Sequence, residues 1–445
     1  MKTQNKIPTG KVERAMKLVG TGARIGGNYL KYYTRKAITG DDNRDQLHED
    51  NAEDIYASLS ELKGSALKVA QMLSMDKNLL PRAYTDKFAM SQYSAPPMSG
   101  PLVVKTFSRS TGKSPLELFD TFETKSAAAA SIGQVHRATL GDKQLAVKVQ
   151  YPGVGDSIRS DLKLVKPVAN AMFGLPEKEM AKYFAEVEEK LMEETDYDLE
   201  LRRSMEISES CGHLPGVLFP RYYPEFSGDK VLVMDWLPGK HLKEFLAENP
   251  AQEIKTRVAQ RLWDFYEYQL HTLRAIHADP HPGNFLFQED GTVGVIDFGC
   301  IKEVPEDFYF QYFPLLLPEI QENAEIIDKL LGYIEILFPT DGEETRNELR
   351  DAFMQMTKLL SRPFASETFH FTNAYLDEIY ALGEKIASIP EVRKPTQSRG
   401  SRHALYVNRT YFGIYSMMAD LNANIVTKPG SWREQLLAHW EPAMV

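Results

Sequence analysis

The sequence predicts an α+β protein, with a predicted β-hairpin in its first half and mostly helical segments around and after it. Residues 133–140 and 144–150 alternate apolar and polar side chains on either side of Gly141-Asp142, which is typical of a β-hairpin. Residues 51–93 and 251–276 instead repeat apolar side chains at three- and four-residue steps, which is typical of amphipathic helices. The length of 445 residues fits two or three packed units.

The composition is that of an ordinary globular protein with an acidic balance. The chain carries a net charge of −10, with 43% hydrophobic and 26% charged residues. The acidic balance argues against a dedicated nucleic-acid-binding protein. Two cysteines, Cys211 and Cys300, do not make a disulfide framework and suit a reducing compartment. No apolar run approaches the ~20 residues that span a bilayer.

The N-terminal region is basic. Residues 11–37 hold seven Lys and Arg side chains, and Val12, Met16, Val19 and Ala23 recur among them at the spacing of a helix. Such a helix can lie on an anionic membrane surface or pack on the rest of the protein. The N-terminus lacks the uninterrupted apolar core of a secretory signal, but its basic character is compatible with a mitochondrial transit segment. We therefore expect a cytoplasmic protein, peripheral to the inner membrane if the helix binds lipid, or a matrix protein in a eukaryote.

The remaining elements follow in order. A polar linker at 38–50 leads to a helical region at 51–93, and Pro96, Pro97 and Pro101 mark a boundary. We expect helices at 102–125, 156–210 and 251–276, buried strands at 231–235 and 293–297, and helices after residue 303. The predicted divisions are 1–50 (basic helix and linker), 51–101 (helical extension), 102–237 (strand-containing lobe with a helical insert) and 238–445 (helical lobe).

The most informative residues lie between His277 and Gly299. Asp279 is followed five positions later by Asn284, and the strand at 293–297 ends at Asp297, which opens an Asp-Phe-Gly tripeptide. In phosphoryl-transfer enzymes, an Asp in such a loop takes a proton from the attacking hydroxyl, while an Asn and a second Asp hold Mg²⁺ against nucleotide phosphates. The pattern predicts a catalytic Asp279 and a metal site at Asn284 and Asp297.

A zinc site is the alternative interpretation of the same loop. His277 and His281 are four residues apart with Asp279 between them. That spacing serves a metal when both rings lie on one face of a helix. Pro280 and Pro282 argue against a helix at this point.

Lys148 lies on the second strand of the predicted hairpin, in an Ala-Val-Lys-Val sequence. A Lys at such a position reaches the α- and β-phosphates of a nucleotide and needs a carboxylate to hold it. The loop expected over the phosphates is rich in alanine instead of glycine, at Ala127, Ala128, Ala129, Ala130 and Ser131. Its methyl groups restrict φ and stiffen the loop, which predicts an unusual phosphate cradle or, alternatively, an alanine-rich helix start.

Three features argue against ordinary protein phosphorylation. Ala278 stands where regulated protein kinases keep an Arg, no Ala-Pro-Glu follows the Asp-Phe-Gly, and no Ser or Thr occurs between Gly299 and Pro339. Tyr309 and Tyr312 remain as possible phosphate acceptors in that stretch.

Together these motifs make the chain resemble the UbiB-like atypical kinases, the aarF-domain proteins linked to ubiquinone biosynthesis. The resemblance covers roughly residues 55–300 and implies a two-lobed protein-kinase-like fold with the helical extension covering the active site. The matching segments, in the family's order, are 63–71 (Lys-Gly-Ser-Ala-Leu-Lys-Val-Ala-Gln), 128–136 (Ala-Ala-Ala-Ser-Ile-Gly-Gln-Val-His), 146–153, 194–200, 279–284 (Asp-Pro-His-Pro-Gly-Asn) and 297–299.

The resemblance also implies roles for individual residues. Lys148 would pair with Glu200, and Lys68, on the covering helix, would meet the carboxylates of Glu194 and Asp196. Gln71 would point toward the nucleotide. Ala70 departs from the family pattern, which has glycine there. Without the resemblance, Glu193, Glu194 and Glu200 could form a solvated acidic helix face.

We expect ATP or ADP to bind with Mg²⁺ between the lobes, the adenine meeting the backbone at Asp235–Leu237 beside Met234. The resemblance implies an atypical ATPase or small-molecule kinase that supports ubiquinone biosynthesis, with isoprenoid lipids or biosynthetic enzymes as partners. A nucleotide-gated scaffold with little turnover is the alternative, and a conventional protein kinase is a third.

Overall fold

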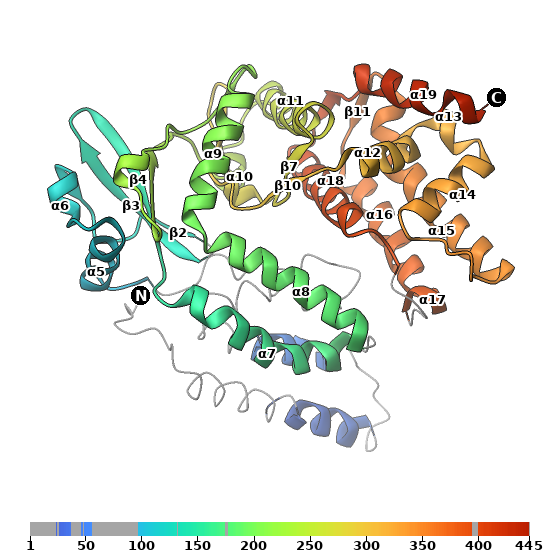
Figure 1. The fold of residues 1–445 in the computed structure, drawn as a ribbon, viewed down its shortest axis with the longest axis horizontal. Helices are drawn as coiled ribbons and strands as arrows, with labels where there is room; N and C mark the ends of the chain where they lie inside the picture. Colours follow the sequence, from blue (N-terminus) through green and yellow to red (C-terminus); the bar gives the residue numbers. More distant parts are fainter. Residues whose placement is uncertain are drawn as a thin grey trace. The chain divides into compact units, whose positions relative to one another are not determined.

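The structure, a computed structural model, describes residues 24, 26–36, 46–47, 49–55, 97–130, 132–173, 177–393 and 399–444 (Figure 1). The chain divides into two compact units. Unit 1 holds the residues up to Met205 together with Arg221–Trp236, and unit 2 holds Glu206–Pro220 and Leu237–Val445. The predicted α+β class is confirmed. Most of the predicted helical extension at 51–101 lies outside the described residues.

Unit 1 is built on an antiparallel sheet of five strands. Its order is β1-β3-β4-β6, and β2 also pairs with β3. The strands are β1 (Thr121–Phe122), β2 (Ala128–Ala130), β3 (Gly133–Leu140), β4 (Lys143–Gln150) and β6 (Val231–Asp235). The predicted hairpin is therefore confirmed. It turns at Gly141, whose φ of 59° suits glycine and whose N–H donates to the Asp120 carboxylate at 2.7 Å.

The alternation of side chains along the sheet separates a face that packs in the apolar core from the opposite face, which carries Lys148. Val147 and Val149 of β4 and Val231 and Val233 of β6 are fully buried in one apolar cluster. Because successive residues of a strand point to opposite faces, Lys148 projects to the other side. The helices of this unit are α5 (Gly100–Thr111), α6 (Pro115–Leu118), α7 (Val154–Phe173), α8 (Glu177–Glu194) and the first turns of α9 (Tyr197–Cys211).

Unit 2 is mostly helical, with short strands near its candidate functional loop. Its helices are α10 (Leu242–Ala247), α11 (Gln252–Tyr268), α12 (Glu306–Tyr312), α13 (Pro318–Gln321), α14 (Ala324–Tyr333), α15 (Glu343–Leu360), α16 (Asn373–Ala387), α17 (Pro390–Arg393), α18 (Arg402–Asp420) and α19 (Ser431–Met444). Its strands are β5 (Val217–Leu218), β7 (Ala275–His277), β8 (Phe285–Phe287), β9 (Val293–Val295), β10 (Ile301–Glu303), β11 (Thr368–His370) and β12 (Asn424–Val426).

Several predicted boundaries are wrong. The helical region at 102–125 ends in strand β1, and the predicted alanine-rich loop is strand β2, because it forms the first arm of a second hairpin with β3. The helix predicted at 251–276 ends at Tyr268, passes through a π-helix at Gln269–Leu273 and becomes strand β7. Strands β11 and β12 interrupt the helices expected after residue 303.

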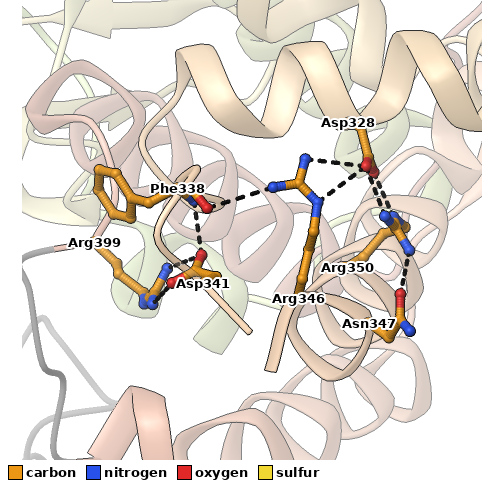
Figure 2. A network of polar contacts seen from close by, with 7 residues as sticks. All are labelled: Asp328, Phe338, Asp341, Arg346, Asn347, Arg350 and Arg399. Carbon is orange, nitrogen blue, oxygen red and sulfur yellow. Dashed lines mark hydrogen bonds and ion pairs between the residues drawn. The ribbon is translucent and has the colours of Figure 1, made fainter. Parts of the chain in front are cut away.

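A network of buried and half-buried charged residues joins α14, α15 and the turn between them in unit 2 (Figure 2). Asp328 of α14 binds Arg346 at 3.1 Å and also Arg350, both on α15, and Arg350 holds the pKa of Asp328 below its ordinary value. In the same network, Arg399 donates to Asp341 at 2.6 Å, and Asp341 accepts from the Phe338 N–H at 2.7 Å. The network therefore joins two helices and fixes the turn after α14.

Replacing Arg399 with Leu should lower the free energy of unfolding of unit 2 by about 3–5 kcal/mol, because the buried Asp341 carboxylate would lose its ion pair with Arg399. The two side chains are only 7% and 4% exposed. Denaturant unfolding measures the loss. As a control, Lys428→Met removes an ion pair with Glu367 whose side chains are 63% and 67% exposed, and should lower the unfolding free energy by no more than about 1 kcal/mol. Equal losses in the two variants would contradict the prediction.

Candidate active site

Two small sheets in unit 2 position Asp279, Asn284 and Asp297. β7 ends two residues before Asp279 and pairs with β10, which follows the Asp297 tripeptide. β8 begins directly after Asn284 and pairs with β9, and the Ile296 N–H donates to the Asn284 carbonyl at 3.1 Å. The backbone of Asn284 is thus hydrogen-bonded to Ile296, the residue that precedes Asp297. The three residues predicted for phosphoryl transfer therefore lie together in the fold.

The Asp279 carboxylate is held from two sides. Its Oδ1 atom accepts from Arg409 Nη2 at 2.8 Å, and both side chains are less than one-fifth exposed. Asn284 Nδ2 lies 3.4 Å from Asp279 Oδ2 and donates to the Asp279 carbonyl at 2.9 Å. The carboxylate that would meet an acceptor hydroxyl is therefore fixed in orientation.

The donor set at Asn284 and Asp297 suits a hard cation. One carboxylate and one amide supply only oxygen donors, and Mg²⁺ is usually bound by one or two such groups together with substrate phosphates. Asp297 Oδ1 also accepts from the Gly299 N–H at 2.8 Å, which fixes the turn of the tripeptide. Phe298, the next residue, is fully buried and anchors this turn in the core of unit 2. The residues present therefore fit the expected magnesium ion.

His277 is a buried support for the loop. It is 0% exposed, its ring packs edge-on against Phe285 and Phe298, and its Nδ1 lies 3.1 Å from the Tyr266 hydroxyl. Its backbone N–H donates to Gln269 Oε1 at 2.8 Å, so the π-helix directly positions the start of the loop. Burial lowers the pKa of His277, although the two Asp carboxylates nearby oppose the shift. The imidazole is therefore suited to packing in its neutral form.

The zinc interpretation gains no support. His281 Nδ1 accepts from the Gly283 N–H at 2.9 Å and so caps the turn Pro282–Asn284. In the part of the chain that the structure describes, no group of three His, Cys, Asp or Glu side chains is arranged to hold a metal. The two histidines stabilise the loop, each through its own hydrogen bond.

Unit 1 supplies a buried ion pair. Lys148 Nζ on β4 lies 2.6 Å from Glu200 Oε1 on α9, and the two side chains are 8% and 3% exposed. Nζ also lies 5.2 Å from the centre of the Tyr197 ring. The pair is the arrangement predicted for a phosphate-binding Lys, and the interpretation of Glu200 as part of a solvated face is wrong.

The acidic residues before Glu200 have separate contacts. Asp196 Oδ1 accepts from the Leu199 N–H at 2.9 Å and so caps α9, one turn before Glu200. Glu193 binds Lys190 and Arg203 at 2.8 and 3.1 Å. Burial alone would raise the pKa of Glu193, but these two cations outweigh burial and hold it below its ordinary value. Glu194 is half-buried at the end of α8.

The alanine-rich segment is an exposed strand. Ala127, Ala128 and Ala129 are exposed and Ala130 is half-buried, and the Ala127 N–H donates to the Val135 carbonyl at 2.8 Å. The hairpin passes very close to β4 at Gly133, where an added Cβ would lie 2.5 Å from the Val149 carbonyl oxygen. Glycine is therefore required at the end of this hairpin, whereas alanine is tolerated along β2.

The residues expected beside adenine lie on β6 and just after it. Met234 is buried in the core of unit 1. The Asp235 carboxylate accepts from the Tyr223 hydroxyl at 2.8 Å and from the Arg221 N–H at 3.2 Å. Its side chain therefore holds the segment 221–223 against the end of β6. In unit 2, Leu237 packs against Gly294 of β9. Their contact with a nucleotide stays a prediction.

Other predicted residues lie outside the described part of the chain. These are Lys68, Gln71 and Ser131, and with them Ala70. The predicted pairing of Lys68 with Glu194 and Asp196 stays a prediction.

Helix α18 supplies contacts that the sequence analysis did not identify. Besides Arg409, it places Tyr406 in a buried cluster with Ala278 and Cys300, and Gly413 directly against Pro280. The signal was present in the sequence, since Arg409 is the one charged residue in the helical run from Ala404 to Met418. For this region the sequence predicted only helices.

Comparison with known proteins agrees with this site. A model of the ABC1 atypical kinase-like domain matches residues 90–331, which is more than half of the chain. The chain belongs to this family. The predicted kinase-like fold and the predicted membership of the atypical kinases are therefore confirmed.

Two curated relatives of this ABC1-family chain are each 26% identical to it. One is the probable serine/threonine-protein kinase abkA of Dictyostelium discoideum, matched over 95% of this chain and 78% of the relative. The other is the mitochondrial atypical kinase COQ8 of Saccharomyces cerevisiae, matched over 94% of this chain and 83% of the relative. A solved structure of Mycobacterium tuberculosis Rv3197 with erythromycin matches at a TM-score of 0.62 and 24% identity, over 90% of this chain and 98% of that one, and supports the fold.

Replacing Gly413 with Ala should destabilise unit 2 by about 1–3 kcal/mol, because the added methyl group overpacks the contact with the loop. A Cβ at Gly413 would lie 2.3 Å from Pro280 Cγ. Thermal or denaturant unfolding measures the effect. The control is Gly332→Ala near the end of α14, where the nearest atom is 3.8 Å away and alanine should be neutral or stabilising by up to about 1 kcal/mol. A stabilised Gly413→Ala variant would refute the proposed close contact.

Proposed function

We propose that the chain is a Mg²⁺-dependent atypical ATPase or small-molecule kinase. The observation that carries this proposal is the arrangement of Asp279, Asn284 and Asp297 at the ends of β7, β8 and β9. In this proposal Asn284 and Asp297 hold Mg²⁺, which neutralises phosphate charge when bound. Lys148, kept in place by Glu200, orients the α- and β-phosphates of ATP or ADP.

Asp279 would position or deprotonate the acceptor. Arg409 and Asn284 fix its carboxylate, so this side chain is already ordered before a substrate binds. Binding therefore loses less conformational entropy at Asp279. The acceptor is either water, in an ATPase, or a small hydroxyl compound, in a kinase. The alanine side chains of Ala127–Ala129 and the hydrogen-bonded backbone of β2 support a phosphate-facing segment that is stiffer than a glycine loop.

The biological role that we infer is support of isoprenoid quinone (ubiquinone) biosynthesis. Its support is the similarity to proteins named atypical kinase COQ8 and the segments shared with the UbiB-like proteins. The mitochondrial label in those names supports a matrix location if the chain is eukaryotic. The constrained alanine hairpin equally favours a second candidate, a nucleotide-gated scaffold for biosynthetic enzymes or lipids with little turnover.

Mg²⁺ with ADP or ATP should raise the thermal unfolding midpoint of the wild type, because a ligand that binds only the native state stabilises it by about 2.7 kcal/mol at 100 times its Kd. Asp297→Asn should abolish the rise, whereas Asp351→Asn, an exposed position on α15, should keep it. Asp279→Asn should keep binding but slow ATP hydrolysis by about 10²- to 10⁴-fold.

The outcomes separate the candidates. Hydrolysis by the wild type that Asp279→Asn slows by at least about 10²-fold supports the enzyme, and tight binding without turnover supports the scaffold. No thermal shift with either nucleotide would refute both.

We also propose peripheral membrane contact through residues 11–37. In the described part of this region, Tyr29, Leu30 and Tyr33 are 40%, 70% and 60% exposed on the helical residues 26–36, and Lys36, seven residues after Tyr29, lies on the same face of the helix. Asn28 donates to Asn51 and Asp54 at 3.1 and 2.9 Å and ties the opposite side of this segment to residues 49–55. Exposed aromatic and apolar side chains beside cations suit an anionic lipid surface. Among the described residues, no helix is long and apolar enough to cross a membrane.

Leu30→Glu should weaken sedimentation of the full chain with anionic phospholipid vesicles by about tenfold, because one buried Leu contributes roughly 1.5–3 kcal/mol. Leu116→Glu on α6 is the matched control, since Leu116 is 71% exposed outside this segment. A wild type that does not sediment with anionic vesicles, or a Leu116→Glu variant that is equally weakened, would contradict the contact.

A further inference from the structure

The candidate catalytic loop receives its cation from a distant helix. Residues 275–287, from β7 through β8, contain no Lys or Arg. The guanidinium beside Asp279 comes from Arg409, 130 residues later in the chain. Because both side chains are less than one-fifth exposed, solvent screens this pair less than it screens a surface pair. The interaction is therefore strong enough to orient the carboxylate.

One face of α18 is seated against the loop. Tyr406, Arg409 and Gly413 follow one another at steps of three and four residues, which places them on one side of a helix. Tyr406 packs with Ala278 and Cys300, and the centre of its ring lies 4.5 Å from Lys302 Nζ. It therefore contacts residues before the loop, at Ala278, and after it, at Cys300 and Lys302. The missing side chain of Gly413 lets the helix approach Pro280.

The rest of α18 is anchored in the core, so this face has little freedom to move. Val407, Thr410 and Ile414 are at most 1% exposed. The Thr410 hydroxyl donates to the Tyr406 carbonyl at 2.9 Å, within the helix itself. A guanidinium carried by such a helix has a defined position relative to the loop.

We propose that Arg409 is a positioning residue for the phosphoryl-transfer reaction. This inference rests on the proposed function. Arg409 holds Asp279 Oδ1, and Asn284 lies beside Oδ2, so the carboxylate cannot rotate away from the acceptor without losing a charged hydrogen bond. A displacement of about 1 Å at a catalytic group can slow a reaction about 10²-fold. Arg409 acts through Asp279 and belongs to the site although it lies in the C-terminal helices.

The test combines kinetics with a double-variant cycle in the full chain. Arg409→Met should lower kcat for Mg·ATP hydrolysis by about 10- to 100-fold, with KM and the Mg·ADP thermal shift within about twofold of wild type. Arg409→Lys, which keeps the charge but not the planar fork, should recover part of the loss. Arg402→Met at the exposed start of α18 should hydrolyse ATP as the wild type does.

The cycle separates a positioning role from a merely structural one. If Arg409 works through Asp279, the variant that combines Arg409→Met with Asp279→Asn should be no slower than Asp279→Asn alone. Full activity of Arg409→Met, additive losses in the double variant, or a parallel loss of kcat and Mg·ADP binding would each overturn the inference while the proposed function stands. A wild type with no ATP turnover would overturn both.

Discussion

The antiparallel pairing of β8 with β9, together with that of β7 with β10, is the constraint on which the candidate site depends. Each pairing is only three residues long, yet the two set the positions of Asp279, Asn284 and Asp297. Such short strands contribute few hydrogen bonds, so their register depends on buried side chains. His277, Phe285 and Phe298 supply that packing, and a slip by one residue would turn them out of the core.

Each unit places a poorly exposed ion pair at a residue for which we propose a chemical role. Lys148 with Glu200 in unit 1 and Asp279 with Arg409 in unit 2 are both held by elements far apart in the sequence. Removing charges from water offsets much of the attraction between them, so such pairs are a weak source of stability. We attribute their value to the orientation that they impose. The pair of Arg399 with Asp341, in contrast, fixes a turn in the helical part of unit 2.

The sequence predicted the parts of the site that depend on local pattern. The β3–β4 hairpin was predictable from alternation and a Gly-Asp turn, and the Asp279–Asp297 region from its motif. The pairing of Lys148 with Glu200 came from the family resemblance, because neither residue's local pattern identifies the other. The role of Arg409 could not be predicted, since it depends on how α18 packs against a loop 130 residues earlier. Strand β2 was missed because three alanines carry little preference for a strand, and the pairing partner decides their conformation.

The π-helix at Gln269–Leu273 has an evolutionary consequence. A π-helix has one residue more in its turn than an α-helix, so it behaves as a single-residue insertion accommodated within a helix. Its first residue, Gln269, binds the backbone of His277, and Arg274 leaves the helix at a φ of 55°. Deleting one residue here would restore a regular helix and rotate everything that follows by about 100°. The length of this segment should therefore tolerate substitutions far better than deletions, because a change in length would misdirect the loop even if every catalytic side chain remained.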